Sequence, residues 1–254
     1  MGMKISICVP TYEMHGSGGA YLAVLFESIN RQTYKDFEVI VSDHSQDDVV
    51  MSVCEKWGKE FEVRYYRNLE GRGNASININ NAIRCADGDV IKPMHQDDFF
   101  YSARCLEAVV SALKNNPGTS WGICGYVHTD AGGERFFRYR IPFYNRNIIK
   151  GDNTIGAPAV MFYRKDGELF DEALIWMNDC ELYYRLFIKH GGPIVMREPL
   201  IAIRLWGNQV TTSISKQKEE FEITHSLSKY GIPRRPIADF LYRFFNKARV
   251  YIKI

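Results

Sequence analysis

The sequence predicts an α/β protein with a mostly parallel sheet flanked by helices. Short apolar segments rich in β-branched residues alternate with amphipathic segments through the first half of the chain. Strands and helices that alternate in this way form parallel sheets with helices on both faces. Of the 254 residues, 46% are hydrophobic, so the chain can bury one sizeable core.

The expected elements follow one another from the N-terminus. The first strand is expected at Ile5–Val9, and residues 20–29 then place Leu22, Phe26 and Ile29 at helical spacing. The next strands are expected at Phe37–Asp43, Glu62–Tyr66, Asp89–Met94 and Ser120–Val127, with helices at about 47–59, 75–86 and 103–116. In the second half, residues 156–164 are also typical of a strand.

The chain is expected to divide into one domain, residues 1–228, and a short tail, residues 229–254. The tail has seven Lys or Arg and one Asp, whereas the first 228 residues have 25 Lys or Arg and 29 Asp or Glu. On a helix over 237–254, the apolar residues form one stripe: Ile237, Leu241, Phe244, Phe245, Ala248 and Ile252. This pattern is typical of a helix that lies on an anionic membrane surface, and a helix packed on its own domain is the alternative.

Composition and motifs also bear on location and partners. The six cysteines are scattered without CxxC spacing, which favours a reducing compartment and argues against a structural zinc site. Neither a signal segment nor an apolar run of ~20 residues is evident, so we expect a cytoplasmic protein, or one bound to the inner face of the cytoplasmic membrane through its tail. The net acidic domain argues against a nucleic-acid partner.

Polar side chains follow three of the predicted strands. Ligands of parallel α/β sheets bind beyond the carboxyl ends of the strands, so these clusters are expected at one edge of the sheet. A solvated turn explains any single cluster, but three at one edge indicate a binding site. The residues are Pro10, Thr11, Tyr12 and Glu13 after the first strand, Asp43 at the end of the second, and Asp97 and Asp98 after the fourth.

Two adjacent carboxylates at a strand end suit a hard divalent cation. Mg²⁺ and Mn²⁺ take oxygen ligands and commonly use one or two protein carboxylates, with phosphate oxygens and water as the other ligands. Such a cation would neutralise charge on a phosphate leaving group. The chain contains no GxxxxGK[ST] loop, so a P-loop enzyme is not expected.

Four segments in a fixed order carry a family resemblance. They are ISICVPTYE, QTYKDFEVIVSDHSQDD, NINNAIRCADGDVI followed by HQDD, and WMNDCELYYRL, and they span roughly residues 4–210. The sequence resembles the inverting glycosyltransferases of family 2, which have the GT-A fold. The resemblance implies a nucleotide-sugar half at about 1–128 and an acceptor half at about 129–228.

The resemblance also implies roles for individual residues. Thr11, Tyr12 and Glu13 would cradle the nucleotide, and Asp43 would hydrogen-bond the base, typically uracil. Asn80 matches the helix that precedes the metal-binding strand. The family's DxD motif falls on His95, Gln96 and Asp97, in which Asp97 is the metal ligand and Asp98 a second candidate ligand. Arg72, Arg164 and Arg204 are further candidates for diphosphate contacts, although each also fits a surface or structural role.

Two positions depart from the family pattern. His95 replaces the first Asp of the motif, and a neutral imidazole contributes no negative charge to a metal site. Trp206 stands where the family often has His, so a late histidine ligand is expected to be missing.

An inverting transferase also needs a base that removes the proton of the acceptor hydroxyl. The resemblance implies that Asp179 is this base. Its position at the start of a predicted helix also fits a simple N-cap.

These observations favour an inverting glycosyltransferase that requires Mn²⁺ or Mg²⁺. Its donor would be a nucleotide-diphosphate sugar, typically a UDP-sugar, and its acceptor a hydroxyl of a growing cell-surface glycan or lipid-linked oligosaccharide. Two alternatives remain: a catalytically weak nucleotide-sugar-binding scaffold of the same fold, and a nucleotidyltransferase.

Overall fold

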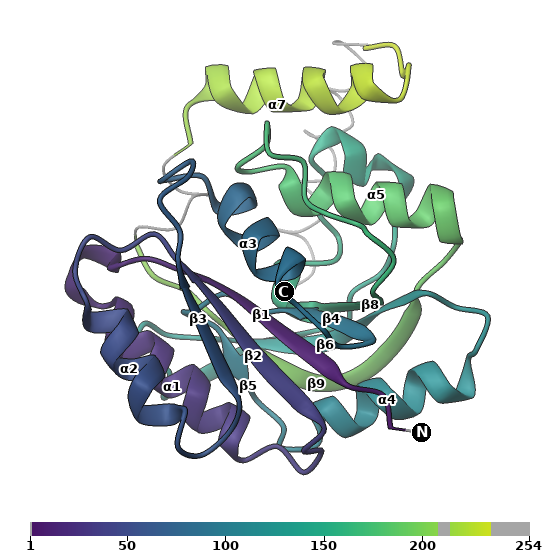
Figure 1. The fold of residues 1–254 in the computed structure, drawn as a ribbon. Coiled ribbons are helices and arrows are strands. Elements are labelled where there is room, and N and C mark those ends of the chain that lie inside the picture. Colours follow the sequence, from purple (N-terminus) through teal and green to yellow (C-terminus); the bar gives the residue numbers. More distant parts are fainter. Residues whose placement is uncertain (1, 208–213, 235–254) are drawn as a thin grey trace.

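One sheet links the two halves of the chain. The computed structural model describes residues 2–207 and 214–234, and its strands lie in the order β3-β2-β1-β4-β8-β6-β9-β5, with β7 paired to β6 (Figure 1). The strands are β1 (Ile5–Thr11), β2 (Phe37–Asp43), β3 (Val63–Arg67), β4 (Val90–Pro93), β5 (Phe99–Phe100), β6 (Trp121–Thr129), β7 (Phe136–Arg140), β8 (Met161–Arg164) and β9 (Ile194–Arg204).

The first four strands of this order form the parallel part that the sequence predicts. β1 pairs in parallel with β2 and β4, and β2 with β3. All seven residues of β2 are buried, as expected for a strand covered on both faces. The parallel register brings the carboxyl ends of β1 and β2 together, with Thr11 opposite Asp43.

Beyond β4 the sheet is mixed, so the expectation of a mostly parallel sheet holds only for the first half. β8 is antiparallel to both β4 and β6, β5 is antiparallel to β9, and β7 is antiparallel to β6. Among the described strands beyond β4, only β6 and β9 are parallel. The strand expected over 156–164 begins at Met161, because Pro158 starts a 3-10 turn, η3 (Pro158–Val160), and has no N–H for a strand ladder.

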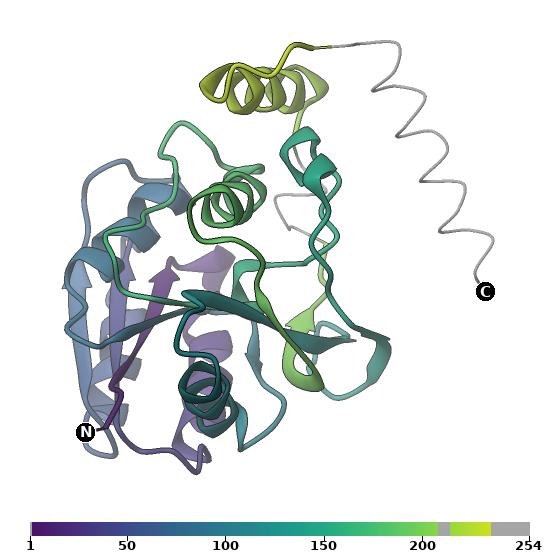
Figure 2. The ribbon, with the colours of Figure 1, turned by 90° about the vertical axis from the view of Figure 1, so that its right-hand side faces the viewer.

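Helices cover both faces of the sheet. They are α1 (Gly18–Asn30), α2 (Val49–Trp57), α3 (Ala75–Arg84), α4 (Cys105–Asn115), α5 (Asn178–His190) and α7 (Lys216–Lys229), with 3-10 turns η1 (Met14–Gly16) and η2 (Arg146–Lys150). Figure 2 shows α4 on one side of the sheet and α5 on the other, with α7 as an outer layer over α5. The core between these layers is continuous from β1 to α7.

The helices begin where local chemistry favours it. Asn74 caps α3, since its side-chain oxygen accepts hydrogen bonds from the backbone N–H groups of Ser76 and Ile77 at 2.9 and 3.2 Å. Ser215 caps α7 in the same manner through the backbone N–H of Lys218. These caps fix the starts of two helices that carry contacts to the site described below.

Two further expectations concern the cysteines and the tail. All six cysteines are free thiols, and five of them are buried. No helix within residues 2–207 and 214–234 is long and apolar enough to cross a membrane. The amphipathic helix expected over 237–254 lies outside the described residues.

Candidate active site

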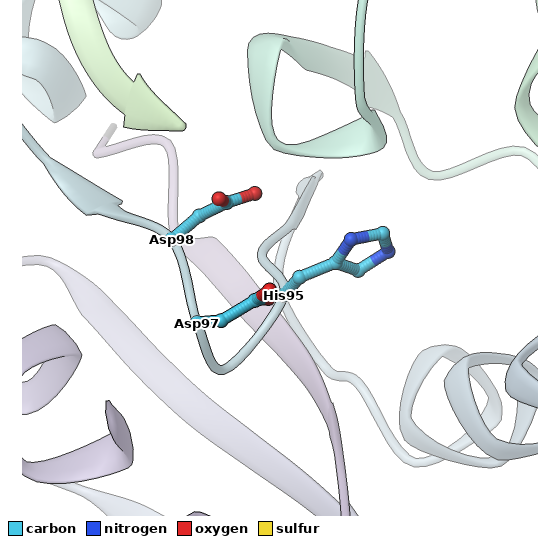
Figure 3. A group of neighbouring side chains, drawn as sticks. All are labelled: His95, Asp97 and Asp98. Atoms are coloured by element: carbon cyan, nitrogen blue, oxygen red, sulfur yellow. The ribbon is translucent and has the colours of Figure 1, made fainter. Parts of the chain in front are cut away.

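Three possible metal ligands lie together on the loop between β4 and β5. The ligand atoms of His95, Asp97 and Asp98 all lie within 4.8 Å of one another, and Figure 3 shows the three side chains on this loop. Opposite ligands of an octahedral cation are separated by about 4 Å when each bond is near 2.1 Å. The spacing and the carboxylate oxygens therefore fit one hard divalent cation after small side-chain rotations.

Asp98 is the buried member of this group. Its Oδ1 accepts a hydrogen bond from the backbone N–H of Arg204 at 3.1 Å. Burial raises the pKa of the Asp98 carboxyl well above its ordinary value, and the neighbouring Asp97 adds to the rise. A bound cation would oppose both effects by favouring the ionised carboxylate.

Arg204 supports this loop from β9. The guanidinium is buried and donates through Nε to the backbone oxygen of Asp97 at 2.9 Å. It also lies 4.6 Å from the ring centre of Tyr21 and 5.5 Å from that of Phe99. Arg204 therefore positions the loop between β4 and β5, and its burial does not fit the diphosphate contact considered for it from the sequence.

Trp206 contacts Asp97, the residue that the sequence predicts to be the metal ligand. Its indole Nε1 donates to Asp97 Oδ2 at 2.7 Å, and its ring lies 5.9 Å from that of Tyr21. An indole N–H can only donate a hydrogen bond, so Trp206 orients the carboxylate but cannot bind a metal itself. A histidine at this position could bind the metal directly. The missing histidine is thus replaced by a group that orients Asp97 and occupies one of its oxygens.

Gln96 connects the loop after β1 to the loop between β4 and β5. Its side-chain oxygen accepts from the Tyr12 N–H at 2.7 Å, and its Nε2 donates to the carbonyl oxygens of Tyr12 and Gly18 at 3.0 and 3.2 Å. A Cβ at Gly18 would lie 2.3 Å from the Tyr12 oxygen, so glycine permits this close approach. Gln96 therefore fixes the backbone of the loop after β1.

Asp43 is enclosed in a hydrogen-bond network at the end of β2. The side chain is fully buried, and Oδ1 accepts from Thr11 Oγ1 at 3.0 Å and from the backbone and hydroxyl of Ser45 at 2.9 and 2.6 Å. Oδ2 accepts from the hydroxyl of Tyr65 at 2.7 Å. A nucleobase would reach the carboxylate only by displacing one of these donors, so its direct contact with a base stays a prediction.

The other residues expected at the nucleotide site differ from one another in how far they are exposed to solvent. Tyr12 is 40% exposed, and burial of its ring, with Asp97 nearby, raises its pKa. Pro10 and Glu13 are half-buried, and the Glu13 carbonyl accepts from the N–H groups of Gly16 and Gly18. Asn80 is buried on α3.

Asn80 holds the loop that precedes α5. Its Nδ2 donates to the Phe170 oxygen at 2.9 Å and to Glu172 at 3.0 Å, while its oxygen accepts from the Phe170 N–H at 2.8 Å. These contacts occupy the amide, so the structure gives Asn80 a positioning role. Two residues earlier, Asn78 is the one that reaches the strand ends, because its Nδ2 donates to the Thr11 carbonyl at 2.9 Å.

Asp179 lies at the second position of α5, in the half that the resemblance assigns to the acceptor. The residue that caps this helix is Met177, so Asp179 is not the N-cap. Its Oδ2 accepts from Asn153 Nδ2 at 2.8 Å and its Oδ1 from the Cys180 N–H at 2.6 Å. Burial raises the pKa of Asp179 to about 6, and these hydrogen bonds oppose the rise. A carboxylate with this pKa suits proton transfer near neutral pH.

Glu222 of α7 fixes the backbone that enters α5. Its fully buried carboxylate accepts hydrogen bonds from the N–H groups of Ile175, Trp176 and Met177 at 3.1, 2.8 and 2.8 Å. These N–H groups lie just before α5, and a carboxylate at the start of a helix is favoured by the helix dipole. Glu222 therefore sets the position from which Asp179 is presented.

In a second group of possible metal ligands, a carboxylate is already paired with basic side chains of the chain. Asp166, Glu168 and His190 lie near one another, but Glu168 is paired with Lys189 and with Arg185. Cations of the chain occupy the places that a metal would need, so we do not consider this group a metal site.

Several supporting residues escaped the sequence analysis. Trp206 was noticed only as a missing histidine, and nothing in the local sequence connects Glu222 to residue 177, 45 positions away. Ser45, two residues after Asp43, was a local signal, because its hydroxyl can hydrogen-bond to that carboxylate, whereas Tyr65 is distant in sequence. Arg164, weighed for diphosphate, instead donates to the Leu113 carbonyl at the end of α4.

Comparison with known sequences gives a family match and related proteins. Residues 6–170 match the model described as "Glycosyl transferase family 2". The GalNAc(5)-diNAcBac-PP-undecaprenol beta-1,3-glucosyltransferase of Campylobacter jejuni is 30% identical over 251 residues, which cover 98% of this chain and 71% of that protein.

Comparison with solved structures gives matches across almost the whole chain. TarS 1–349 of S. aureus in complex with UDP superposes with a TM-score of 0.70 at 17% identity, over 99% of this chain and 75% of the TarS segment. The chain spans 41% of the longer TarS chain. The mannosyltransferase PcManGT from Pyrobaculum calidifontis, in complex with GDP-Man and Mn²⁺, superposes with a TM-score of 0.59 at 12% identity, over 98% and 81% of the two chains. At such identities these likenesses show a shared fold.

Proposed function

The chain belongs to glycosyl transferase family 2 and has the GT-A fold, and from this premise we propose that it transfers a sugar from a UDP-sugar to a hydroxyl with inversion. The acceptor in this proposal is a growing cell-surface glycan or a lipid-linked oligosaccharide. The observation that carries the proposal is the group of His95, Asp97 and Asp98 at the carboxyl ends of the parallel strands. The undecaprenol-linked substrate named for the Campylobacter relative and the UDP bound to TarS support the choice of acceptor and donor.

In the proposed division, residues 1–128 bind the donor and residues 129–228 the acceptor. The donor nucleotide lies over the ends of β1 and β2, beside the exposed Tyr12. Asp43 shapes this part of the site through Thr11, Ser45 and Tyr65, whose hydroxyls it holds. The base contact expected of Asp43 remains part of the proposal.

His95, Asp97 and Asp98 would hold Mn²⁺ or Mg²⁺ in this scheme. When bound, the cation would neutralise the charge that develops on the diphosphate leaving group. Trp206 and Arg204 keep Asp97 and its loop in place for this purpose.

Asp179 is the proposed general base. The acceptor oxygen forms its bond to the anomeric carbon while the bond from that carbon to the diphosphate oxygen breaks, and the hydroxyl proton passes to the Asp179 carboxylate. A pKa of about 6 leaves the carboxylate ionised at pH 7.5 yet more basic than an exposed Asp. Asn153 and Cys180 orient its two oxygens.

The tail adds a proposal about location. Residues 237–254 would lie on the inner face of the cytoplasmic membrane, where a lipid-linked acceptor is presented. This proposal rests on the apolar stripe and the positive charge of that segment in the sequence.

A second candidate function is favoured by one specific contact. The Trp206 indole hydrogen-bonds to Asp97 Oδ2 and takes up part of the capacity of that oxygen to bind a cation, and His95, in the place of the first Asp of the family motif, adds no negative charge of its own. A protein with this site could bind a nucleotide sugar and turn it over slowly, as a scaffold subunit.

The products released during turnover distinguish a transferase from a scaffold and from a nucleotidyltransferase. We would incubate the protein with a panel of UDP-sugars and Mn²⁺ and measure UDP release, which reports slow donor hydrolysis even without an acceptor. Transfer predicts Mn²⁺-dependent UDP release that Asp97→Ala abolishes and the exposed Asp87→Asn leaves unchanged. Donor binding without UDP release would favour the scaffold, and release of pyrophosphate in the presence of a nucleoside triphosphate would indicate a nucleotidyltransferase.

A further inference from the structure

An exposed strip of aromatic and cationic side chains runs along β7 and the residues after it. We call residues 135–143 the β7 strip. All five residues of β7 are exposed, and Tyr139 and Phe143 are 48% and 58% exposed. Of the thirteen exposed large hydrophobic residues in the described part of the chain, five fall in this strip: Phe136, Phe137, Tyr139, Ile141 and Phe143. Such clustering marks an interaction surface rather than scattered exposure.

The β7 strip is also strongly cationic. It contains Arg135, Arg138 and Arg140, and no Asp or Glu occurs from residue 135 to residue 151. Arg135 pairs with Asp130 at 3.0 Å, while neither Arg138 nor Arg140 forms an ion pair within residues 2–207 and 214–234. This charge stands against the trend of residues 1–228, which have four more acidic than basic residues.

A β-bulge explains why apolar and cationic side chains face outward together. The register between β6 and β7 shifts after Tyr126, and Arg138 has a left-handed φ of 54°. The bulge breaks the alternation that would otherwise turn every second side chain inward. The guanidinium of Arg138 lies 5.9 Å from the ring centre of Phe137, so cation and aromatic ring form one surface.

The β7 strip is tied to both halves of the proposed active site. Before it, the Ala131 carbonyl accepts a hydrogen bond from Arg204 at 2.6 Å, and the Arg204 backbone contacts Asp98. At its other end, the Phe143 N–H donates to the Thr154 carbonyl, next to Asn153, which contacts Asp179. The strip therefore connects the metal-binding loop to the base.

We propose that the β7 strip is a docking surface for an anionic lipid bilayer. Its aromatic side chains lie in the interfacial region, and its arginines contact lipid phosphates. Charge complementarity selects this occupant: a second copy would bring a second set of arginines against the first, and a neutral glycan offers the arginines no anion. Docking here holds the site at the membrane surface by a folded element, independently of catalysis and of the tail at 237–254.

Vesicle binding by the full chain tests this proposal. Cosedimentation would use phosphatidylcholine vesicles and vesicles with equal parts phosphatidylcholine and phosphatidylglycerol at 0.1 M salt. The variants are R138Q/R140Q and F136S/F143S, with I188S/F221S as the control for exposed apolar area, since these residues are 56% and 52% exposed on α5 and α7. R31Q is the control for an exposed arginine.

The wild type is expected to bind the anionic vesicles and not the neutral ones. At about 1 kcal/mol per arginine near the surface, R138Q/R140Q should lose at least tenfold in affinity, and the loss should shrink at high salt. F136S/F143S should lose affinity at any salt concentration, while both controls stay within twofold of the wild type.

Three outcomes would overturn the proposal. If the wild-type protein does not bind anionic vesicles, the β7 strip is not a membrane-docking surface. If the β7 variants bind the vesicles as tightly as the wild type, membrane binding belongs to the tail. β7 variants that lose binding to a charged glycan but still bind the vesicles would show that the strip is an acceptor surface. Soluble UDP release is measured separately, so failure of the transferase proposal leaves this result interpretable.

Discussion

Replacing Asp179 by Asn should make the protein more stable while abolishing its activity. The substitution keeps the shape of a buried side chain and removes its charge. Burial disfavours that charge, as the rise of the Asp179 pKa from 3.8 to about 6 indicates. Stabilisation with loss of function is expected when a charged group is kept buried for chemistry.

The magnitude follows from the linkage between pKa and folding. A rise from 3.8 to about 6 corresponds to about 3 kcal/mol of destabilisation at pH 7.5, at ~1.4 kcal/mol per unit. The folded state binds the proton more tightly, so this cost appears as pH rises from 3.8 through 6, and roughly half of it is relieved at pH 5. The new amide of D179N also faces Asn153 Nδ2, a donor, which offsets part of the gain. We expect a net gain of about 1–2 kcal/mol at pH 7.5.

Thermal unfolding and kinetics check both sides of this prediction. For a domain of this size the gain corresponds to a rise in Tm of about 2–6 °C at pH 7.5, and to a smaller rise at pH 5. The kcat/KM of the wild type should fall about tenfold per pH unit below pH 6, and D179N should lose at least ~10²-fold in kcat at any pH. The exposed D87N is the control. A lower Tm for D179N, or substantial activity with an unchanged pH profile, would refute the assignment of Asp179 as a buried base.

Three other substitutions test the contacts that position the site. E222Q should lower the free energy of unfolding by about 2–3 kcal/mol and reduce kcat, because an amide cannot accept all the backbone N–H bonds that the Glu222 carboxylate accepts. Chemical denaturation measures the loss of stability, and initial rates measure the loss of kcat. W206F should weaken Mn²⁺-dependent UDP binding about tenfold, since Asp97 loses the donor that orients it; calorimetry measures the change. G18A should weaken UDP binding at least tenfold with or without metal, because the added Cβ would lie 2.3 Å from the Tyr12 carbonyl oxygen.

Matched variants separate these effects from general damage. Glu219 lies on the first turn of α7, so E219Q controls for charge removal from that helix. W57F replaces a half-buried tryptophan on α2, away from the metal-binding loop. Wild-type activity in E222Q, unchanged Mn²⁺ affinity in W206F, or normal UDP affinity in G18A would each contradict the role given to that residue.

The parallel half of the fold could be predicted because its signals are local. β1, β2 and β4 begin with apolar runs, β3 carries Val and two Tyr, and each strand is separated from the next by a helical period. Even so, β9 was not anticipated, since Pro199 and charged residues interrupt its eleven-residue span. The direction of β8 between β4 and β6 depends on partners distant in sequence, which periodicity does not encode.

The site was predicted in the same uneven way. The convergence of the β1, β2 and β4 ends followed from topology, and the structure brings His95, Asp97 and Asp98 together there. The sequence could not show which polar side chains form hydrogen bonds to other residues of the protein. Nucleotide contacts by Asp43 and Gln96 stay predictions, and the structure adds that both side chains hydrogen-bond to other residues of the chain.

The most direct test of the account is the calorimetry of UDP binding with and without Mn²⁺, in the wild type and in Asp97→Ala. The account predicts that Mn²⁺ strengthens UDP binding to the wild type and that Asp97→Ala loses this enhancement, with Asp87→Asn behaving like the wild type. Metal-independent UDP binding that survives in Asp97→Ala, or no UDP binding under any metal condition, would contradict a metal-assisted UDP-sugar site at the carboxyl ends of these strands.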